Sequence, residues 1–138
     1  MSYETEREVL ETHFLENWPE TEIDWENVEA SPELEADKQA GSPWVRFTIQ
    51  NGQAFAAAIG GDPLMYRSPG VVFVQVFTKS GIGTAIGAGL ADKVAAIFRG
   101  KRLTGGIHCQ APTVTRIGRD GSWFQFNVSI PFYRDEVE

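Results

Sequence analysis

The sequence of 138 residues contains one cysteine, two histidines and no long run of hydrophobic residues. The single cysteine, Cys109, cannot form a disulfide within the chain, and we expect it to be a small core residue in a reducing compartment. No segment approaches the roughly 20 consecutive apolar residues that a membrane-spanning helix needs. The acidic N-terminus is also unlike a signal peptide, which begins with basic residues. These absences predict a cytoplasmic protein without membrane contact.

Basic residues are scarce in the first 40 residues, where 13 aspartates and glutamates accompany only Arg7 and Lys38. The remainder of the chain has ten basic and six acidic residues. The net charge is therefore −11 in the first part and +4 in the second, which gives −7 for the whole chain. This distribution argues against specific binding of nucleic acid. It allows the acidic part of one copy to attract the basic part of another, although the acidic residues could also serve only to keep a helix and a loop soluble.

Two amphipathic helices are predicted. Residues 3–17 follow a candidate N-cap at Ser2 and place Leu10, Phe14 and Trp18 at intervals of four. A second helix follows the glycine-rich stretch 81–89 and runs to about residue 99. Its expected buried stripe consists of Ile86, Leu90, Val94 and Ile97.

Strands are predicted from alternating polarity around two turn signals. Residues 113–119 and 122–133 flank Asp120-Gly121, and residues 44–50 and 53–59 flank Asn51-Gly52. In the first hairpin, pairing of Arg119 with Ser122 would put four apolar side chains on one face: Ile117, Phe124, Phe126 and Val128. In the second hairpin, a face on which the glycine-rich helix could dock would combine three large residues with three alanines: Val45, Phe47, Ile49, Ala54, Ala56 and Ala58.

Three further strands complete the expected sheet. Residues 71–78 are apolar on both faces and suit a central strand, and shorter strands are expected at residues 23–28 and 107–112. Since the chain is long enough to bury about two-thirds of its unfolded surface, we expect one domain, residues 1–138. The fold class is α+β, a mixed and mostly antiparallel sheet built from hairpins, with two helices packed on one face. The second face would then need a neighbouring copy to cover it.

Two segments are predicted to be loops with a role in contacts. Residues 29–43 are acidic, rich in proline, glycine and serine, and longer than packing requires, so we expect them to be mobile. Residues 60–68 display an unusual density of apolar side chains, which marks either a contact site or a loop packed back onto the sheet.

Few residues suggest catalysis or cofactor binding. Gly81, Gly83 and Gly87 resemble a dinucleotide-binding fingerprint, but the repeated strand–helix units and the acidic residue that such a site needs do not follow. A flexible helix entry and close helix packing explain these glycines better. His108 and Cys109 are adjacent in a strand and therefore point to opposite faces, so they are not expected to share a metal or form a nucleophile–base pair. We expect no enzyme activity, cofactor or metal.

Several segments together resemble the tail-terminator proteins of bacteriophages and prophages, a family related to minor tail protein U. The resemblance covers almost the whole chain and rests on structural blocks, without a catalytic motif. The blocks are residues 17–19 (Asn-Trp-Pro), 23–28, 44–48, 70–77, 90–98 and 123–135.

This resemblance implies an α+β subunit that forms a ring, commonly a hexamer, on the end of a completed tail. Such a ring stops polymerisation of the tail tube and presents the surface that joins the head. The implied partners are further copies of this chain, the tail tube protein and the head–tail connector or neck proteins, and the implied location is the bacterial host cytoplasm and then the virion tail. Alternatives are a neck or head-completion protein, or a small-ligand-binding or enzymatic domain. The charge distribution and the apolar loop, and not the resemblance, give the candidate subunit and tail interface: Arg99, Lys101, Arg102, Glu33, Glu35, Asp37, Leu64, Met65, Tyr66 and Arg67.

Overall fold

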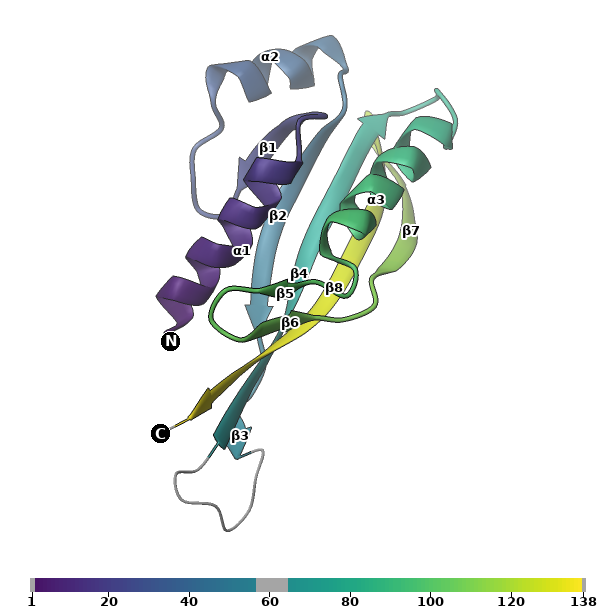
Figure 1. Cartoon of the computed structure of the whole chain (residues 1–138). Coiled ribbons are helices and arrows are strands. Elements are labelled where there is room, and N and C mark those ends of the chain that lie inside the picture. The colour runs from purple at the N-terminus through teal and green to yellow at the C-terminus, as the bar shows by residue number, and fades with distance from the viewer. Residues whose placement is uncertain (1, 57–64, 138) are drawn as a thin grey trace.

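The computed structural model describes residues 2–56 and 65–137, and within them three helices and eight strands form an α+β fold (Figure 1). The sheet is mixed and mostly antiparallel, as the sequence predicts. The elements in chain order are α1 (Tyr3–Asn17), β1 (Glu22–Trp25), α2 (Pro32–Ala40), β2 (Trp44–Asn51), β3 (Phe55–Ala56), β4 (Met65–Lys79), α3 (Ala85–Phe98), β5 (Arg102–Leu103), β6 (Ile107–Cys109), β7 (Thr113–Asp120) and β8 (Trp123–Val137).

The two long strands β4 and β8 form the centre of the sheet. They are antiparallel and in register over their whole length, from Met65 opposite Val137 to Lys79 opposite Trp123. The strand order is β1-β2-β4-β8-β6-β5, with β3 added to β4 and β7 added to β8. Strand β1 therefore forms one edge of the sheet, while β5 and β7 lie at the opposite edge. The predicted central strand is confirmed as part of β4.

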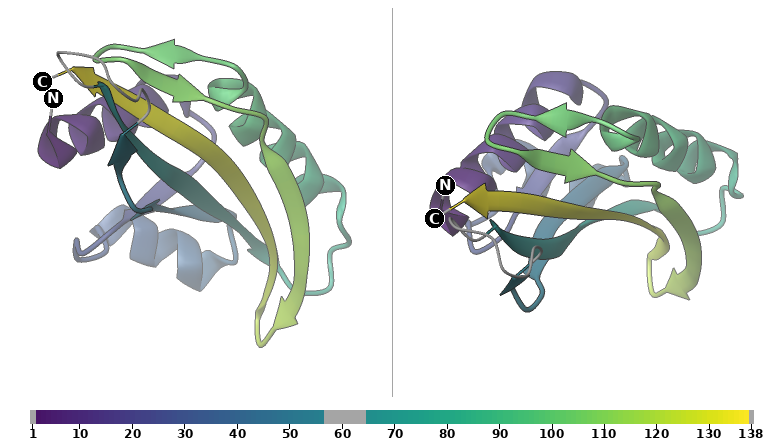
Figure 2. Two further views of the ribbon diagram at one scale, coloured as in Figure 1. Left: turned by 90° about the horizontal axis from the view of Figure 1, so that it is seen from below. Right: turned by 60° about the horizontal axis from the view of Figure 1, so that its bottom comes forward.

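Helices α1 and α3 pack on one face of the sheet, and α2 lies on the other (Figures 1 and 2). The predicted bounds of α1 are confirmed, and the hydroxyl of Ser2 accepts a hydrogen bond from the backbone N–H of Thr5 at 3.2 Å. Leu10 and Phe14 are fully buried against the sheet. This N-cap and the spacing of four explain why the local sequence was sufficient to predict the helix.

The structure confirms part of the predicted stripe of α3: Val94 is buried, and Leu90 and Ile97 are half-buried against the core. The structure buries Gly87, Ala91, Val94, Ala95 and Phe98, whereas Ile86 is 52% exposed. Three of these residues, Gly87, Ala91 and Ala95, are small, and the helix approaches the sheet closely at Gly87: a Cβ atom there would lie 2.6 Å from Cε2 of Phe126. The helix packs on β8 and β4, so the predicted docking on a face lined by alanines is wrong. The interpretation of these glycines as a close-packing device therefore holds at Gly87.

Two alanine substitutions in α3 are expected to have opposite effects. Gly87→Ala should lower the free energy of unfolding by about 1–3 kcal/mol, because Phe126 is buried and cannot move aside. Gly89→Ala should raise it by up to about 1 kcal/mol, because that position is exposed, has free space around it and gains helix propensity. Urea denaturation of both variants and the wild type measures the difference, and equal effects would contradict this packing.

The acidic segment 29–43, predicted to be a loop, contains the helix α2. Ser31 caps it by accepting a hydrogen bond from the backbone N–H of Leu34, Pro32 occupies its first turn, and Gly41 ends it with a positive φ of 77°. These residues are standard helix start and stop signals, whereas the acidic composition of the segment favours a solvated loop. Leu34 is fully buried, so this part of the segment packs on the subunit as a helix and the predicted loop is wrong here.

The predicted hairpin around Asn51-Gly52 is also wrong. Strand β2 continues through Asn51 and pairs antiparallel with β4, while β3 pairs separately with residues 66 and 67 of β4. Val45, Phe47 and Ile49 therefore lie opposite Val76, Val74 and Val72, and not opposite alanines. Ala58 lies outside the described residues. Burial of valine and phenylalanine pairs explains why β2 adds to β4 despite the local turn signal.

The C-terminal hairpin is confirmed, with a different register. Asp120 pairs with Trp123, so the two-residue turn is Gly121-Ser122 and Gly121 has a φ of 60°. Phe124, Phe126 and Val128 share the face that packs on the core, as predicted. Ile117 does not join them, because a β-bulge between Arg116 and Gly118 leaves Ile117 52% exposed.

Candidate functional site

The sheet face turned away from α1 and α3 is covered at one end by α2. Leu34 packs against Trp44 and Phe77, with Trp123 beside them. The rings of Trp44 and Phe77 are stacked with centroids 4.1 Å apart, and Nζ of Lys38 lies 4.2 Å from the centroid of the Trp44 ring. The part of this face that is richest in aromatic residues is therefore shielded within the subunit.

The remainder of the second face mixes apolar and polar side chains. Val71 and Phe73 are half-buried, and Gln75 lies between them and the α2 end. On β8, Nε2 of Gln125 donates a hydrogen bond to Oδ1 of Asn127 at 2.7 Å. The expectation that the whole second face needs a neighbouring copy is thus wrong, since α2 covers its most apolar end and polar groups occupy much of the rest. Other surfaces must be considered for contacts between copies.

The candidate basic residues lie at the edge of the sheet formed by β5 and β7. Arg99 follows the last residue of α3, Lys101 lies in the turn, and Arg102 begins β5. All three are exposed. No ion pair between residues of the described ranges involves them. They therefore present unneutralised positive charge to solvent.

The candidate acidic residues lie at the other side of the molecule. Glu33 and Glu35 are exposed in the first turn of α2, and Asp37 is half-buried on the same helix. Helix α2 packs on β1 and β2, at the edge opposite β5. Seen from below, α2 lies across the sheet from the β5–β6 hairpin (Figure 2). The structure thus keeps the two candidate charge groups apart within one chain, as a contact between two copies requires.

The third candidate group is not a loop in the described residues. Met65, Tyr66 and Arg67 are the first residues of β4, and Leu64 lies outside the described ranges. Nε and Nη2 of Arg67 donate to the two carboxylate oxygens of Asp135 at 2.8 and 3.0 Å. The guanidinium also lies 4.0 Å from the centroid of the Tyr133 ring. Arg67 is therefore committed to contacts with β8 and is less available to a partner than predicted.

The hydrogen bonds from Arg67 hold the pKa of Asp135 below its ordinary value. The charged carboxylate is therefore favoured in the folded state, and its stabilising effect is complete above the unfolded pKa of about 3.9 and is lost as the pH falls through the folded pKa. We expect Asp135→Asn to be less stable than the wild type at pH 7 and equally stable at the acid end. Urea denaturation between pH 7 and pH 2 tests this, with the exposed Asp120→Asn as a control; a difference that persists unchanged at the lowest pH would contradict it.

The histidines and the cysteine are occupied by structural contacts. Nε2 of His13 is hydrogen-bonded to the carbonyl oxygen of Ile97 at 2.8 Å, and the ring of His108 stacks on Tyr133 with centroids 4.7 Å apart. Cys109 is buried, as predicted, and burial raises the pKa of its thiol to about 11. Within residues 2–56 and 65–137, no three His, Cys, Asp or Glu side chains are grouped as metal ligands.

Sequence reasoning missed a buried ion pair between the two ends of the chain. Nε of Arg134 on β8 donates to Oε1 of Glu6 on α1 at 3.1 Å, and both residues are 1% exposed. Oε2 of Glu6 accepts a hydrogen bond from Nδ2 of Asn51 at 2.8 Å, and Nη1 of Arg134 lies 3.3 Å from Glu136. The one sequence signal was that these charges replace apolar residues at core positions of an amphipathic pattern. The pair fastens α1 to the central strand.

Comparisons with known proteins agree with the fold and the resemblance. Residues 7–132 match a family described as phage tail terminator protein. A solved protein structure with 19% sequence identity superposes with a TM-score of 0.68, covering 99% of this chain and 96% of that chain, and shows the same fold. No curated protein matches this sequence. Among the described residues, no helix has both the length and the apolar character needed to cross a membrane.

Proposed function

Because this chain belongs to the phage tail terminator family, we propose that it caps the completed tail tube as an oligomeric ring, stops tube polymerisation and forms the surface that joins the head. Membership of the family supports a structural role in phage tail assembly and supports the protein being a component of the virion tail. In this proposal the chain is not an enzyme. Its partners are copies of itself, six in the ring, together with the tail tube protein and the connector or neck proteins, and it assembles in the cytoplasm of the bacterial host.

The observation that carries the ring proposal is the placement of opposite charges at opposite edges of one sheet. The basic turn of Arg99, Lys101 and Arg102 lies at one edge, and the acidic helix α2 lies at the other. A contact between unlike surfaces of identical copies repeats from copy to copy and closes into a ring when the rotation permits. In this proposal, assembly covers the exposed acidic side chains of α2, Glu33 and Glu35, while Leu34 stays packed within the subunit.

The proposed function is tested by adding the purified protein to polymerising tail tube protein of the same phage or prophage. Electron microscopy of negatively stained tubes measures their lengths and the density at their ends. We expect shorter tubes with a capped end, in proportion to the amount of protein added. Tubes of unchanged length with bare ends would overturn the proposal, and a protein that joins heads to finished tubes without limiting their length would instead be a neck protein.

Charge reversal of the basic turn is expected to weaken ring formation while the subunit stays folded. The double variant Arg99→Glu/Arg102→Glu should weaken self-association roughly tenfold or more, because like charges would then meet across the contact. High salt should weaken the association of the wild type in the same direction. Sedimentation velocity measures the association, and circular dichroism checks the fold.

The matched control for this variant is Lys38→Glu/Lys79→Glu, which changes the net charge by the same amount. Lys38 lies on the acidic helix and Lys79 at the end of β4 near it, so this control adds negative charge where negative charge is already expected. It should leave association intact. Equal loss of association in both variants would show that net charge alone, and not the basic turn, controls assembly.

A further inference from the structure

Exposed aliphatic side chains occur at both edges of the sheet. At the β1 edge, Leu15 of α1 is 59% exposed and Val28, in the turn after β1, is 58% exposed. At the opposite edge, Val114 and Ile117 of β7 are 40% and 52% exposed. Single exposed aliphatic side chains are common on protein surfaces. Here, however, they lie near acidic side chains at the β1 edge and near basic side chains at the β7 edge.

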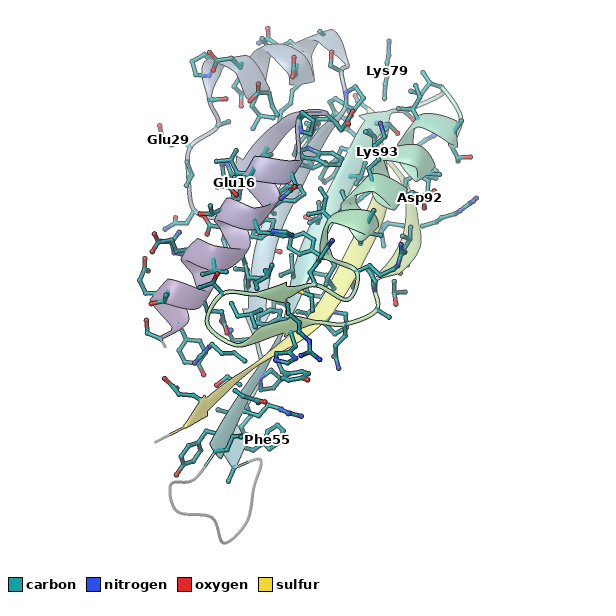
Figure 3. The ribbon with its side chains drawn as sticks, in the orientation of Figure 1. Glu16, Glu29, Phe55, Lys79, Asp92 and Lys93 are labelled. Atoms are coloured by element: carbon teal, nitrogen blue, oxygen red, sulfur yellow. The ribbon has the colours of Figure 1, made fainter. Side chains whose placement is uncertain are left out.

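Two adjoining cavities beside α1 and β1 form a surface depression, which we call the hollow beside β1. A cavity of about 360 Å³ lies between α1, β1 and the segment that leads to α2, and a second cavity of about 280 Å³ adjoins it. Leu15, Trp25 and Val28 line both cavities. Glu22 and Glu29 line the larger one and make no ion pair with another described residue. Figure 3 shows Glu29 on the outer side of this edge. The edge therefore combines an apolar floor with free carboxylates.

Strand β7 has complementary properties. Arg116 and Arg119 are exposed and form no ion pair with another described residue. Residues 93–119 include six basic and no acidic residues. The β-bulge between Arg116 and Gly118 interrupts the ladder, and bulges and charges of this kind discourage simple strand addition at a free edge. Contact through side chains is therefore favoured over extension of the sheet.

We propose that β7 of one copy docks in the hollow beside β1 of the next copy. Val114 and Ile117 cover Leu15, Trp25 and Val28, while Arg116 and Arg119 meet Glu22 and Glu29. The occupant is a second copy of this chain because the matching surfaces are on the same chain, at opposite edges of one sheet, with opposite charge. This docking contact rests on the proposed ring-forming function and assigns residues to the joint between subunits.

A charge-swap experiment tests the docking contact. In the variant Arg116→Glu/Arg119→Glu both docking surfaces, β7 and the hollow beside β1, carry acidic side chains, and in the variant Glu22→Arg/Glu29→Arg both carry basic side chains. Each variant alone should associate roughly tenfold or more weakly than the wild type, because like charges meet at every joint. An equimolar mixture should recover association, since every joint between alternating copies then pairs acidic with basic side chains. Sedimentation velocity on the two variants, the mixture and the wild type measures this.

Mutual rescue distinguishes a direct contact from a loss of folding, because two damaged subunits would not repair each other. Cysteine cross-linking gives an independent measurement: oxidation of a mixture of Val28→Cys and Ile117→Cys proteins should yield a disulfide-linked dimer. The control mixture of Val28→Cys with Ile82→Cys places the second thiol on an exposed residue outside the contact and should yield little.

Two failures are distinguishable. If the wild type caps tail tubes but the charge-swap mixture stays dissociated and no cross-link forms, the docking contact is wrong and the proposed function stands. If the mixture recovers association but no tube is capped, the docking contact stands and the proposed function fails. Variants that associate as strongly as the wild type when alone, or a wild type that stays monomeric at every salt and protein concentration and on tube ends, would overturn the docking contact.

Discussion

Replacing Arg134 with alanine is expected to lower the free energy of unfolding by about 3–5 kcal/mol, because the substitution leaves the carboxylate of Glu6 buried without its charged partner. Among the residues that the structure describes, Asn51 would then be the remaining side-chain donor to Glu6, and a single neutral amide compensates a buried charge poorly. Urea denaturation monitored by tryptophan fluorescence measures the loss. The same variant should expose the N-terminal part of α1 to hydrogen exchange, since Arg134 joins this helix to β8.

Two further variants distinguish the loss of the ion pair from the burial of an uncompensated charge. The double variant Glu6→Leu/Arg134→Leu should be more stable than Arg134→Ala, because removing both partners leaves no uncompensated charge between them. Arg7→Ala is the matched control: Arg7 follows Glu6 on α1, but Arg7 and Glu4 are exposed and Glu11 is half-buried, so its ion pairs should contribute little. Similar losses for Arg134→Ala and Arg7→Ala would contradict a special role for the buried pair.

Local sequence signals predicted the parts of the fold that local interactions determine. The bounds of α1 follow from Ser2 and from the spacing of Leu10 and Phe14, and the C-terminal hairpin follows from alternation around Gly121. Helix α2 follows the same rules, since Ser31 is its N-cap, Pro32 its first residue and Gly41 its C-cap, but the dense acidic charge of the segment favours a solvated loop.

Pairing between distant segments was not predictable in the same way. The turn signal at Asn51-Gly52 suggested a hairpin, but β2 gains more by placing Val45 and Phe47 beside β4. The Glu6–Arg134 pair joins residues 128 positions apart, and no local pattern indicates which carboxylate an arginine of a C-terminal strand will meet.

The candidate interface was predicted in its charge but not in its geometry. The sequence shows that acidic residues precede basic ones, and the structure places these groups at opposite edges because β1 is first and β5 last in the strand order. Met65, Tyr66 and Arg67 were expected in a loop, yet they extend β4, because a 15-residue β8 provides partners for all of them. The hollow beside β1 depends on the separation of α1, β1 and the segment before α2, which only the tertiary structure defines.

The ring of Phe14 joins four elements of the core, and Phe14→Ala is expected to lower the free energy of unfolding by about 3–5 kcal/mol. Phe14 is fully buried on α1, and its ring stacks on Phe47 of β2 and Phe98 of α3 with centroids 5.3 and 5.9 Å apart. An edge contact reaches Trp25 of β1, with centroids 6.4 Å apart. Removing the ring leaves a cavity that none of these elements can fill alone, since each is held by its own neighbours.

The adjacent residue provides the control and connects subunit stability to assembly. Leu15 is 59% exposed, so Leu15→Ala should change the free energy of unfolding by no more than about 0.5 kcal/mol. Because Leu15 also lines the hollow beside β1, the same substitution should weaken self-association if β7 of a second copy docks there. Phe14→Ala should therefore reduce stability first and association as a consequence, whereas Leu15→Ala should reduce association alone. Urea denaturation and sedimentation of the two variants separate these outcomes. A Leu15→Ala protein with a much lower free energy of unfolding would contradict the exposed position of Leu15. A Leu15→Ala protein that associates like the wild type would contradict the role of Leu15 in docking.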